Sequence, residues 1–244
     1  MKKHHDMALP AKPPKNEDLL MCFYEAMYSR FGHRNWWPAE SPFEVCVGAI
    51  LTQNTSWKNV TKAIENLKAA AVLEPLEIYR LSVEQLAELI RPSGYYNIKA
   101  ARLKNFVAVL VEKYRADLTA LFSESMAELR PILLSISGIG KETADSMILY
   151  GAKLPVFVVD AYTKRVLFRH RVISEREDYD GIQKLFHGRL PRDAALFNDF
   201  HAQFVAVGHH YCKKIPQCRQ CPLRELLPED QAKVFIEVEK GKKR

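Results

Sequence analysis

Three stretches of this 244-residue chain carry residue types that could do chemistry. A single carboxylate, Asp160, follows four apolar residues, Val156 to Val159, that are typical of extended backbone. A glycine turn, Gly138-Ile139-Gly140, separates two segments with helical spacing. Near the C-terminus, three cysteines stand close together. A carboxylate can stabilise positive charge or move a proton, a glycine turn before a helix can hold an anion, and clustered thiols can ligate a metal.

The glycine turn predicts two helices with an anion site where they meet. One helix should end near Ile136 and the next should begin at Lys141. Glycine permits a positive φ and close approach of a partner's backbone, and the first N–H groups of the second helix would face outward toward a phosphate. Apolar residues at helical spacing should clamp the two helices together: Ile136, Ile139, Ala144 and Ile148. Another interpretation stays open, because Gly-x-Gly between helices is often only a C-cap.

Helical patterns dominate the rest of the chain and predict an all-α fold. Apolar residues from Glu17 to Phe31 follow helical spacing. Ser41, Pro42 and Glu44 form a helix start before a nearly apolar segment, Phe43 to Leu51, which should be a central core helix. Further helices are expected over residues 58–67, 82–90, 161–173 and 194–211, and in a long segment after the turn at Pro92–Gly94. Basic residues near the start of that long segment suit phosphate contacts or a solvated face equally well: Lys99, Arg102 and Lys104.

Bulk composition indicates a globular protein with an anionic partner. The chain is 48% hydrophobic and 27% charged, and its formal net charge is +7. A basic balance favours nucleic acid as the partner. No run reaches the roughly 18 apolar residues of a membrane span, and the N-terminus lacks the apolar core of a signal peptide, so we expect a cytoplasmic protein without membrane contact. Residues 1–16 are polar and proline-bearing and should be disordered.

Two loops flank the predicted core helix and hold all three tryptophans. Trp36-Trp37-Pro38 precedes the helix, and Thr52-Gln53-Asn54-Thr55 with Trp57 follows it. Adjacent tryptophans in a loop often serve only as a packing plug, and Gln53 could simply cap the helix end.

Taken together, the glycine turn, the polar loop and the Val-Val-Asp that ends at Asp160 resemble the helix-hairpin-helix signature of the endonuclease III superfamily of DNA glycosylases. The resemblance covers about residues 18–222. It implies two helical lobes with a DNA-binding cleft between them: a continuous barrel of residues 41–152 that carries the helix-hairpin-helix at about 129–150, and a discontinuous lobe of residues 17–40 and 153–244. Its partner would be double-stranded DNA containing a damaged base, bound by a monomer.

The resemblance also implies roles for single residues. Asp160 would stabilise the positive charge that develops on the sugar and orient the attacking water, besides capping its own helix. Gln53 would fill the gap that a flipped-out base leaves. Glu142 stands where glycosylase-lyases of the superfamily have a nucleophilic lysine, so a Schiff base cannot form there. The hairpin residues would bind DNA phosphates: Gly138, Ile139, Gly140, Lys141 and Thr143.

Within this superfamily, the tryptophan loop, the Leu-Thr-Gln-Asn-Thr motif and Gly-Ile-Gly-Lys-Glu look most like the 3-methyladenine DNA glycosylase III branch. In that branch aromatic side chains stack on an alkylated purine. The matching positions are Trp36, Trp37, Pro38 and Trp57. The leading hypothesis is therefore a monofunctional glycosylase for alkylated purines. The alternatives are an endonuclease III-like activity on oxidised or mismatched bases and a non-catalytic binder of damaged DNA, for which Asp160 would have no use.

The three clustered cysteines, Cys212, Cys218 and Cys221, resemble the iron–sulfur loop of endonuclease III, which has four cysteines. The fourth would fall near Leu227. A [4Fe–4S] cluster held by three thiolates is possible, with Cys22 as a distant further thiolate, and so is zinc held with His209 or His210. A degenerate loop without metal is the alternative, which suits the glycosylase III branch.

Overall fold

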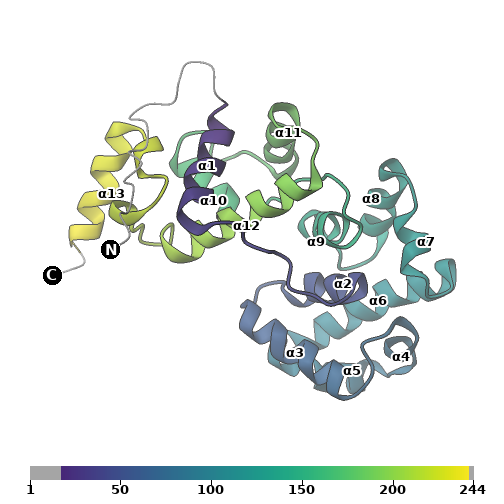
Figure 1. Ribbon diagram of the computed structural model, residues 1–244. Coiled ribbons are helices and arrows are strands. Elements are labelled where there is room, and N and C mark those ends of the chain that lie inside the picture. The colour runs from purple at the N-terminus through teal and green to yellow at the C-terminus, as the bar shows by residue number, and fades with distance from the viewer. Residues whose placement is uncertain (1–17, 242–244) are drawn as a thin grey trace, which may run out of the picture. The chain divides into compact units, whose positions relative to one another are not determined.

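The computed structural model describes residues 18–241, so the segment 1–16 that we expect to be disordered lies outside the described residues, as does Lys242–Arg244. The chain divides into two compact units (Figure 1). The continuous unit is Trp37–Val158, and the discontinuous unit joins the chain up to Trp36 with the chain from Val159 onward. Between residues 18 and 241 no segment forms a β-strand, and the predicted all-α class is confirmed.

The continuous unit is built around α2 (Pro42–Leu51), in which every residue from Phe43 to Leu51 is buried. The predicted helix start is confirmed, because Oγ of Ser41 accepts the N–H of Glu44 at 3.1 Å. The long α6 (Tyr96–Tyr114) packs against α2 and against the short helices before it. The other helices of this unit are α3 (Trp57–Ala69), α4 (Pro75–Arg80), α5 (Val83–Leu89), the 3₁₀ turn η1 (Arg91–Ser93), α7 (Leu118–Phe122), α8 (Met126–Ser135), α9 (Lys141–Ser146) and the π-helical turn η2 (Met147–Gly151).

Two of these helices were not predicted. The short helices α4 and α7 have too few residues for a periodic apolar pattern to show, and each is defined by its packing on α6. The predicted extended run Val156–Val159 is confirmed as extended loop: its residues are buried and leave the continuous unit just before Asp160.

The discontinuous unit is centred on α12 (Ala194–His210), which packs against α1 (Leu19–Phe31) and α10 (Ala161–Arg169). The rings of Phe186, Phe200 and Phe204 form its core, with the rings of Phe200 and Phe204 stacked 5.1 Å apart. Its remaining helices are α11 (Tyr179–Arg189), the 3₁₀ turns η3 (Cys218–Gln220) and η4 (Arg224–Leu226), and α13 (Glu229–Gly241). Neither α11 nor α13 was predicted.

No helix of the described part of the chain is both long and apolar enough to cross a membrane.

Candidate active site

The predicted glycine turn between two helices is present: α8 ends at Ser135, and α9 begins at Lys141. Gly138 has a φ of +95°, and a Cβ there would lie 2.2 Å from Cγ of Arg102, so only glycine fits. Gly140 has an ordinary φ of −93°, and a Cβ there would meet no heavy atom within 4 Å. Gly138 is therefore required by the backbone conformation of the turn. Gly140 faces open space that the backbone of a ligand could occupy.

Gln53 joins the loop after α2 to this turn. Its Nε2 donates to the carbonyl oxygen of Gly138 at 3.2 Å and to Oγ1 of Thr143 at 2.9 Å. Arg102 donates to its Oε1. The hydroxyl of Thr143 is thus engaged inside the protein, and Gln53 would have to exchange these bonds to act as a wedge in DNA.

The interpretation of the basic residues at the start of α6 as a solvated or phosphate-facing row is wrong for Lys99. Lys99 is 1% exposed, and its Nζ donates to the carbonyl oxygens of Leu51 and Ser93 at 2.8 and 2.7 Å. Lys104 donates to carbonyl oxygens at the end of α4. Both side chains satisfy the carbonyl groups at helix ends, which is a packing role that spacing alone does not reveal.

The first turn of α9 carries Lys141, which is half-buried, and Glu142, which is exposed. The start of α9 therefore presents a carboxylate at the surface of the continuous unit.

Trp37 and Trp57 meet within the continuous unit, as their loops' places on either side of α2 suggested. Their rings are 4.9 Å apart at 86°, an edge-to-face contact, and the Trp37 ring also lies 5.1 Å from that of Tyr150. A Cβ on Gly48 of α2 would come within 3.2 Å of the Trp37 ring, so the core helix leaves room for the indole. Tyr150, in the π-helical turn η2, was not predicted as part of this group.

The predicted base pocket has two further residues, Trp36 and Pro38. Trp36 is half-buried and is the last residue of the discontinuous unit before the chain enters the continuous one, and Pro38 is exposed.

Asp160 caps α10 at its N-terminus, because its Oδ1 accepts the N–H of Thr163 at 2.7 Å. Its second carboxylate oxygen, Oδ2, lies 3.7 Å from Nε2 of His201 on α12. Burial lowers the pKa of His201, and the nearby Asp160 opposes that shift only in part. The imidazole is therefore neutral at pH 7 and leaves the negative charge of the carboxylate uncancelled.

His201 was not predicted. The sequence held a faint signal for it, because Asp199, His201 and Gln203 alternate with apolar residues in the middle of this helix. Asp199 and Gln203 are explained by packing: Gln203 donates to the carbonyl oxygen of Gly32 at 2.8 Å, and Asp199 accepts the N–H of Arg34 at 2.7 Å.

Comparison with known proteins places this geometry in a family. Residues 47–192, more than half of the chain, match the family of HhH-GPD superfamily base excision DNA repair proteins. The chain belongs to the HhH-GPD superfamily. It is a DNA glycosylase of the endonuclease III-like kind, and the predicted resemblance is confirmed.

Individual HhH-GPD relatives extend the comparison. A candidate DNA repair glycosylase of Methanocaldococcus jannaschii is 46% identical over 209 residues, which are 85% of this chain and 95% of the relative. Endonuclease III of Thermotoga maritima is 31% identical over 75% of this chain and 81% of the relative. Among solved structures, the Helicobacter pylori 3-methyladenine DNA glycosylase MagIII bound to 1,N6-ethenoadenine has a TM-score of 0.67 at 30% identity, over 78% of this chain and 97% of that one. An endonuclease III–DNA complex, at 23% identity and a TM-score of 0.75, supports the fold alone and covers 89% of this chain and 96% of that one.

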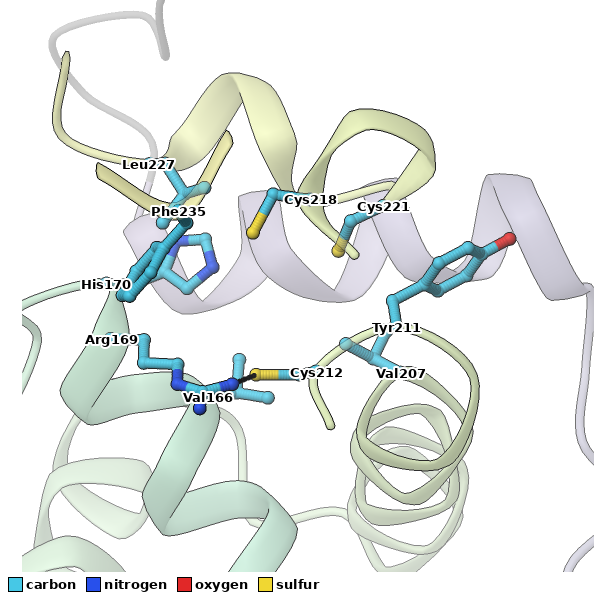
Figure 2. Close-up of a pocket in the computed structure, with 10 residues that line it drawn as sticks. All are labelled: Val166, Arg169, His170, Val207, Tyr211, Cys212, Cys218, Cys221, Leu227 and Phe235. Carbon is cyan, nitrogen blue, oxygen red and sulfur yellow. Dashed lines mark hydrogen bonds between the residues drawn. The ribbon is translucent and has the colours of Figure 1, made fainter. Parts of the chain in front are cut away.

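The three clustered cysteines of this HhH-GPD chain surround one small pocket in the discontinuous unit (Figure 2). Nη1 of Arg169 donates to Sγ of Cys212 at 3.2 Å. Nδ1 of His170 lies 3.2 Å from the carbonyl oxygen of Leu226. Leu227, at the place of the fourth cysteine, lines the same pocket, and so does Phe235 of α13. His209 and His210, the histidines proposed for zinc, are exposed and do not line it.

These residues do not fit a four-thiolate cluster. Leu227 and Phe235 present apolar surface where a ligand of the cluster would be needed. The pocket is also small, because the volume open to the centre of a water molecule is about 10 Å³. Burial raises the pKa of Cys221 to about 12 in the absence of a metal. Among residues 18–241, no three His, Cys, Asp or Glu side chains are close enough to share a metal ion.

Proposed function

We propose that this DNA glycosylase is monofunctional and hydrolyses the N-glycosidic bond of alkylated purines such as 3-methyladenine in double-stranded DNA, acting as a monomer. The observation that carries the proposal is the pair of indoles, Trp37 and Trp57, held edge to face beside Tyr150. Electron-poor alkylated purines stack well on indole faces. The 30% identity to MagIII, whose structure contains 1,N6-ethenoadenine, supports the same substrate class.

The chemistry assigned to Asp160 is electrostatic and needs no covalent intermediate. The bond between C1′ and the base nitrogen breaks, and its electron pair leaves with the base. For a cationic alkylated purine the base departs neutral. Positive charge builds on the sugar, and the Asp160 carboxylate stabilises it. Water then bonds to C1′, and its proton passes to the carboxylate and on to solvent.

Glu142 supports hydrolysis by water over lyase chemistry. A glycosylase-lyase needs an amine that attacks C1′ and forms an imine. At the matching position this chain has an exposed carboxylate, and Lys141 is the neighbouring residue, about 100° around the helix. The hairpin supplies the phosphate site, through the backbone N–H groups at the start of α9 and the open face of Gly140. Gln53 supplies the wedge.

Identification of released bases tests the substrate class. The purified protein is incubated with duplex DNA treated with a methylating agent, and in parallel with duplexes that carry an oxidised pyrimidine, uracil or a mismatch. Release of methylated purines alone is the expected result. Release of only oxidised or mismatched pyrimidines would replace the proposal with the endonuclease III-like activity.

Asp160→Asn tests the catalytic assignment. This variant should bind damaged duplex as well as the wild type does, because its amide still caps α10 and phosphate contacts come from other residues. Base release under single-turnover conditions should fall by about two to three orders of magnitude, the scale of losing one key electrostatic stabiliser. A variant that keeps the wild-type rate would show that Asp160 is only a helix cap.

A further inference from the structure

A second polar side chain, His201, lies beside Asp160, and the proposed function assigns no role to it. His201 comes from α12, some forty residues further along the chain, and its side chain is 7% exposed while that of Asp160 is 12% exposed. Asp160 and His201 lie in the same unit, so their contact is a property of that unit.

The two helices that carry the pair are held at close range. Tyr162 of α10 packs directly on Gly208 of α12, where a Cβ would lie 2.2 Å from a carbon of the tyrosine ring. Arg165 of α10 donates from Nε to the carbonyl oxygen of Cys212 at 2.6 Å, just past the end of α12. These contacts set the spacing at which His201 reaches Asp160.

The two oxygens of Asp160 have different environments. Oδ1 is fixed by the N–H of Thr163 at 2.7 Å, as part of the helix cap. Oδ2 faces Nε2 of His201 at 3.7 Å. This distance exceeds that of a direct hydrogen bond, but hydrogen bonds among active-site groups are often long without substrate and shorten when it binds.

A neutral imidazole suits this position better than a cation would. Lysine or arginine at the same place would form an ion pair with Asp160 and cancel the negative charge that the sugar needs in the transition state. A neutral N–H donor can orient the carboxylate without cancelling that charge. Among residues 18–241, His201 is the side chain that lies against Oδ2 of Asp160, and the backbone N–H of Thr163 occupies Oδ1.

We propose that His201 is a positioning residue for the glycosylase reaction: its Nε2–H donates to Oδ2 of Asp160 in the substrate complex, so that Thr163 and His201 together fix both carboxylate oxygens. The inference rests on the proposed role of Asp160. It assigns the proton of the neutral ring to Nε2 and gives α12 a part in the reaction.

Two substitutions at His201 separate positioning from packing. His201→Leu removes the donor, and His201→Gln keeps an N–H donor near the position of Nε2. Single-turnover release of methylated purines from duplex DNA should fall about ten- to a hundredfold in the Leu variant, the scale of one hydrogen bond to a charged group. The Gln variant should recover most of the wild-type rate. Binding to a duplex with a tetrahydrofuran abasic-site analogue should be unchanged in both.

Phe204→Leu provides the matched control on the same helix. Phe204 is fully buried in the phenylalanine cluster of α12 and touches neither Asp160 nor the reaction. It should lower the melting temperature while the single-turnover rate stays at the wild-type value. If His201→Leu does not fold, His201→Gln still tests the inference. Its single-turnover rate must then stay close to that of the wild type and of Phe204→Leu.

A double variant tests whether His201 acts through Asp160. Asp160→Asn combined with His201→Leu should be no slower than Asp160→Asn alone. If His201→Leu slows base release as much in the Asp160→Asn background as in the wild type, the inference is overturned. A wild-type rate in His201→Leu would also overturn it. So would a rate in His201→Gln as low as that of His201→Leu. If Asp160→Asn itself keeps the wild-type rate, the proposed function fails together with the inference. An inactive Asp160→Asn beside a fully active His201→Leu overturns the inference alone.

Discussion

At the scale of single residues, the proposal that the enzyme is monofunctional depends on Glu142. It is exposed in the first turn of α9. Under the proposed mechanism, an amine at this position would supply the nucleophile of a glycosylase-lyase.

Glu142→Lys should therefore gain a covalent intermediate. Borohydride added during reaction with damaged duplex should trap an enzyme–DNA adduct with the Lys variant and none with the wild type or with Glu142→Gln, which controls for loss of the carboxylate. Denaturing gel electrophoresis detects the adduct. A trapped wild-type adduct that maps to Lys141 would show that the protein is bifunctional and that the register of the nucleophile is displaced by one residue.

Sequence reasoning identified residues whose role is tied to a local pattern. Asp160 follows an extended apolar run, and Trp37 and Trp57 flank a core helix, so spacing was enough to single them out. His201 and Tyr150 escaped because their relevance comes from tertiary contacts with Asp160 and Trp37, which no local period encodes. Lys99 was misread for a related reason: a lysine near a helix start is usually solvated, and only the packing of α6 on α2 buries it.

At the scale of elements, the boundaries of the helices with strong start signals were predictable. The capping box of Ser82 and Gln85 and the cap of Ser41 are local chemistry, and both are present. The short helices α4 and α7 were not predictable, because so few residues define no period, and the π-helical turn η2 depends on how the end of the hairpin packs against α2.

The two glycines of the hairpin should respond differently to alanine. Gly138→Ala places a Cβ at a φ of +95° and against Arg102, so it should lower the melting temperature, with a cost of about 1–3 kcal/mol. Gly140→Ala has room within its own unit and should leave the melting temperature unchanged while it weakens binding to duplex DNA. Thermal unfolding and fluorescence anisotropy measure the two effects. Equal DNA affinity in the wild type and Gly140→Ala would argue that the turn is only a helix cap.

Lys99 joins the end of α2 to η1, and its burial makes the stability of the protein depend on pH. Burial, aided by the positive charge of Arg102, lowers the pKa of Lys99 to about 8. The unfolded chain therefore binds this proton more tightly than the folded chain does. The fold therefore favours the neutral amine over the charged ammonium, and stability rises as the pH increases from about 8 toward the ordinary lysine pKa near 10.4. The neutral amine still has two hydrogens for its two carbonyl acceptors.

Lys99→Met isolates this effect. The variant leaves two carbonyl oxygens without their donor and should lose roughly 1–3 kcal/mol at pH 7.5. Urea unfolding at pH 7.5 and pH 10 should show the free-energy difference between wild type and variant growing with pH, by up to about 3 kcal/mol. All other groups titrate alike in the two proteins and cancel. A difference that shrinks with pH would mean that the charged ammonium is the form the fold prefers.

At the scale of the whole molecule, the charge and the aromatic cluster contribute to binding in different ways. A formal net charge of +7 attracts any duplex, damaged or not. Displacement of counterions makes that attraction fall steeply with salt, by a slope of about −0.9 per neutralised phosphate in a log–log plot. Stacking of a flipped base on indole displaces no counterions and should not depend on salt in this way.

The preference for a damaged base should therefore be independent of salt even though the affinity is not. In the Asp160→Asn background, which prevents turnover, the affinities for duplexes with and without one 1,N6-ethenoadenine should fall in parallel between 50 and 200 mM salt. Trp57→Ala in the same background should reduce the preference by roughly ten- to a hundredfold and leave both slopes unchanged, because one base–aromatic stack is lost and no phosphate contact is. Trp57→Phe controls for the volume of the side chain. If Trp57→Ala instead lowered both affinities equally, the indole would be supporting the fold of its loop, and recognition of the damaged base would have to come from other side chains.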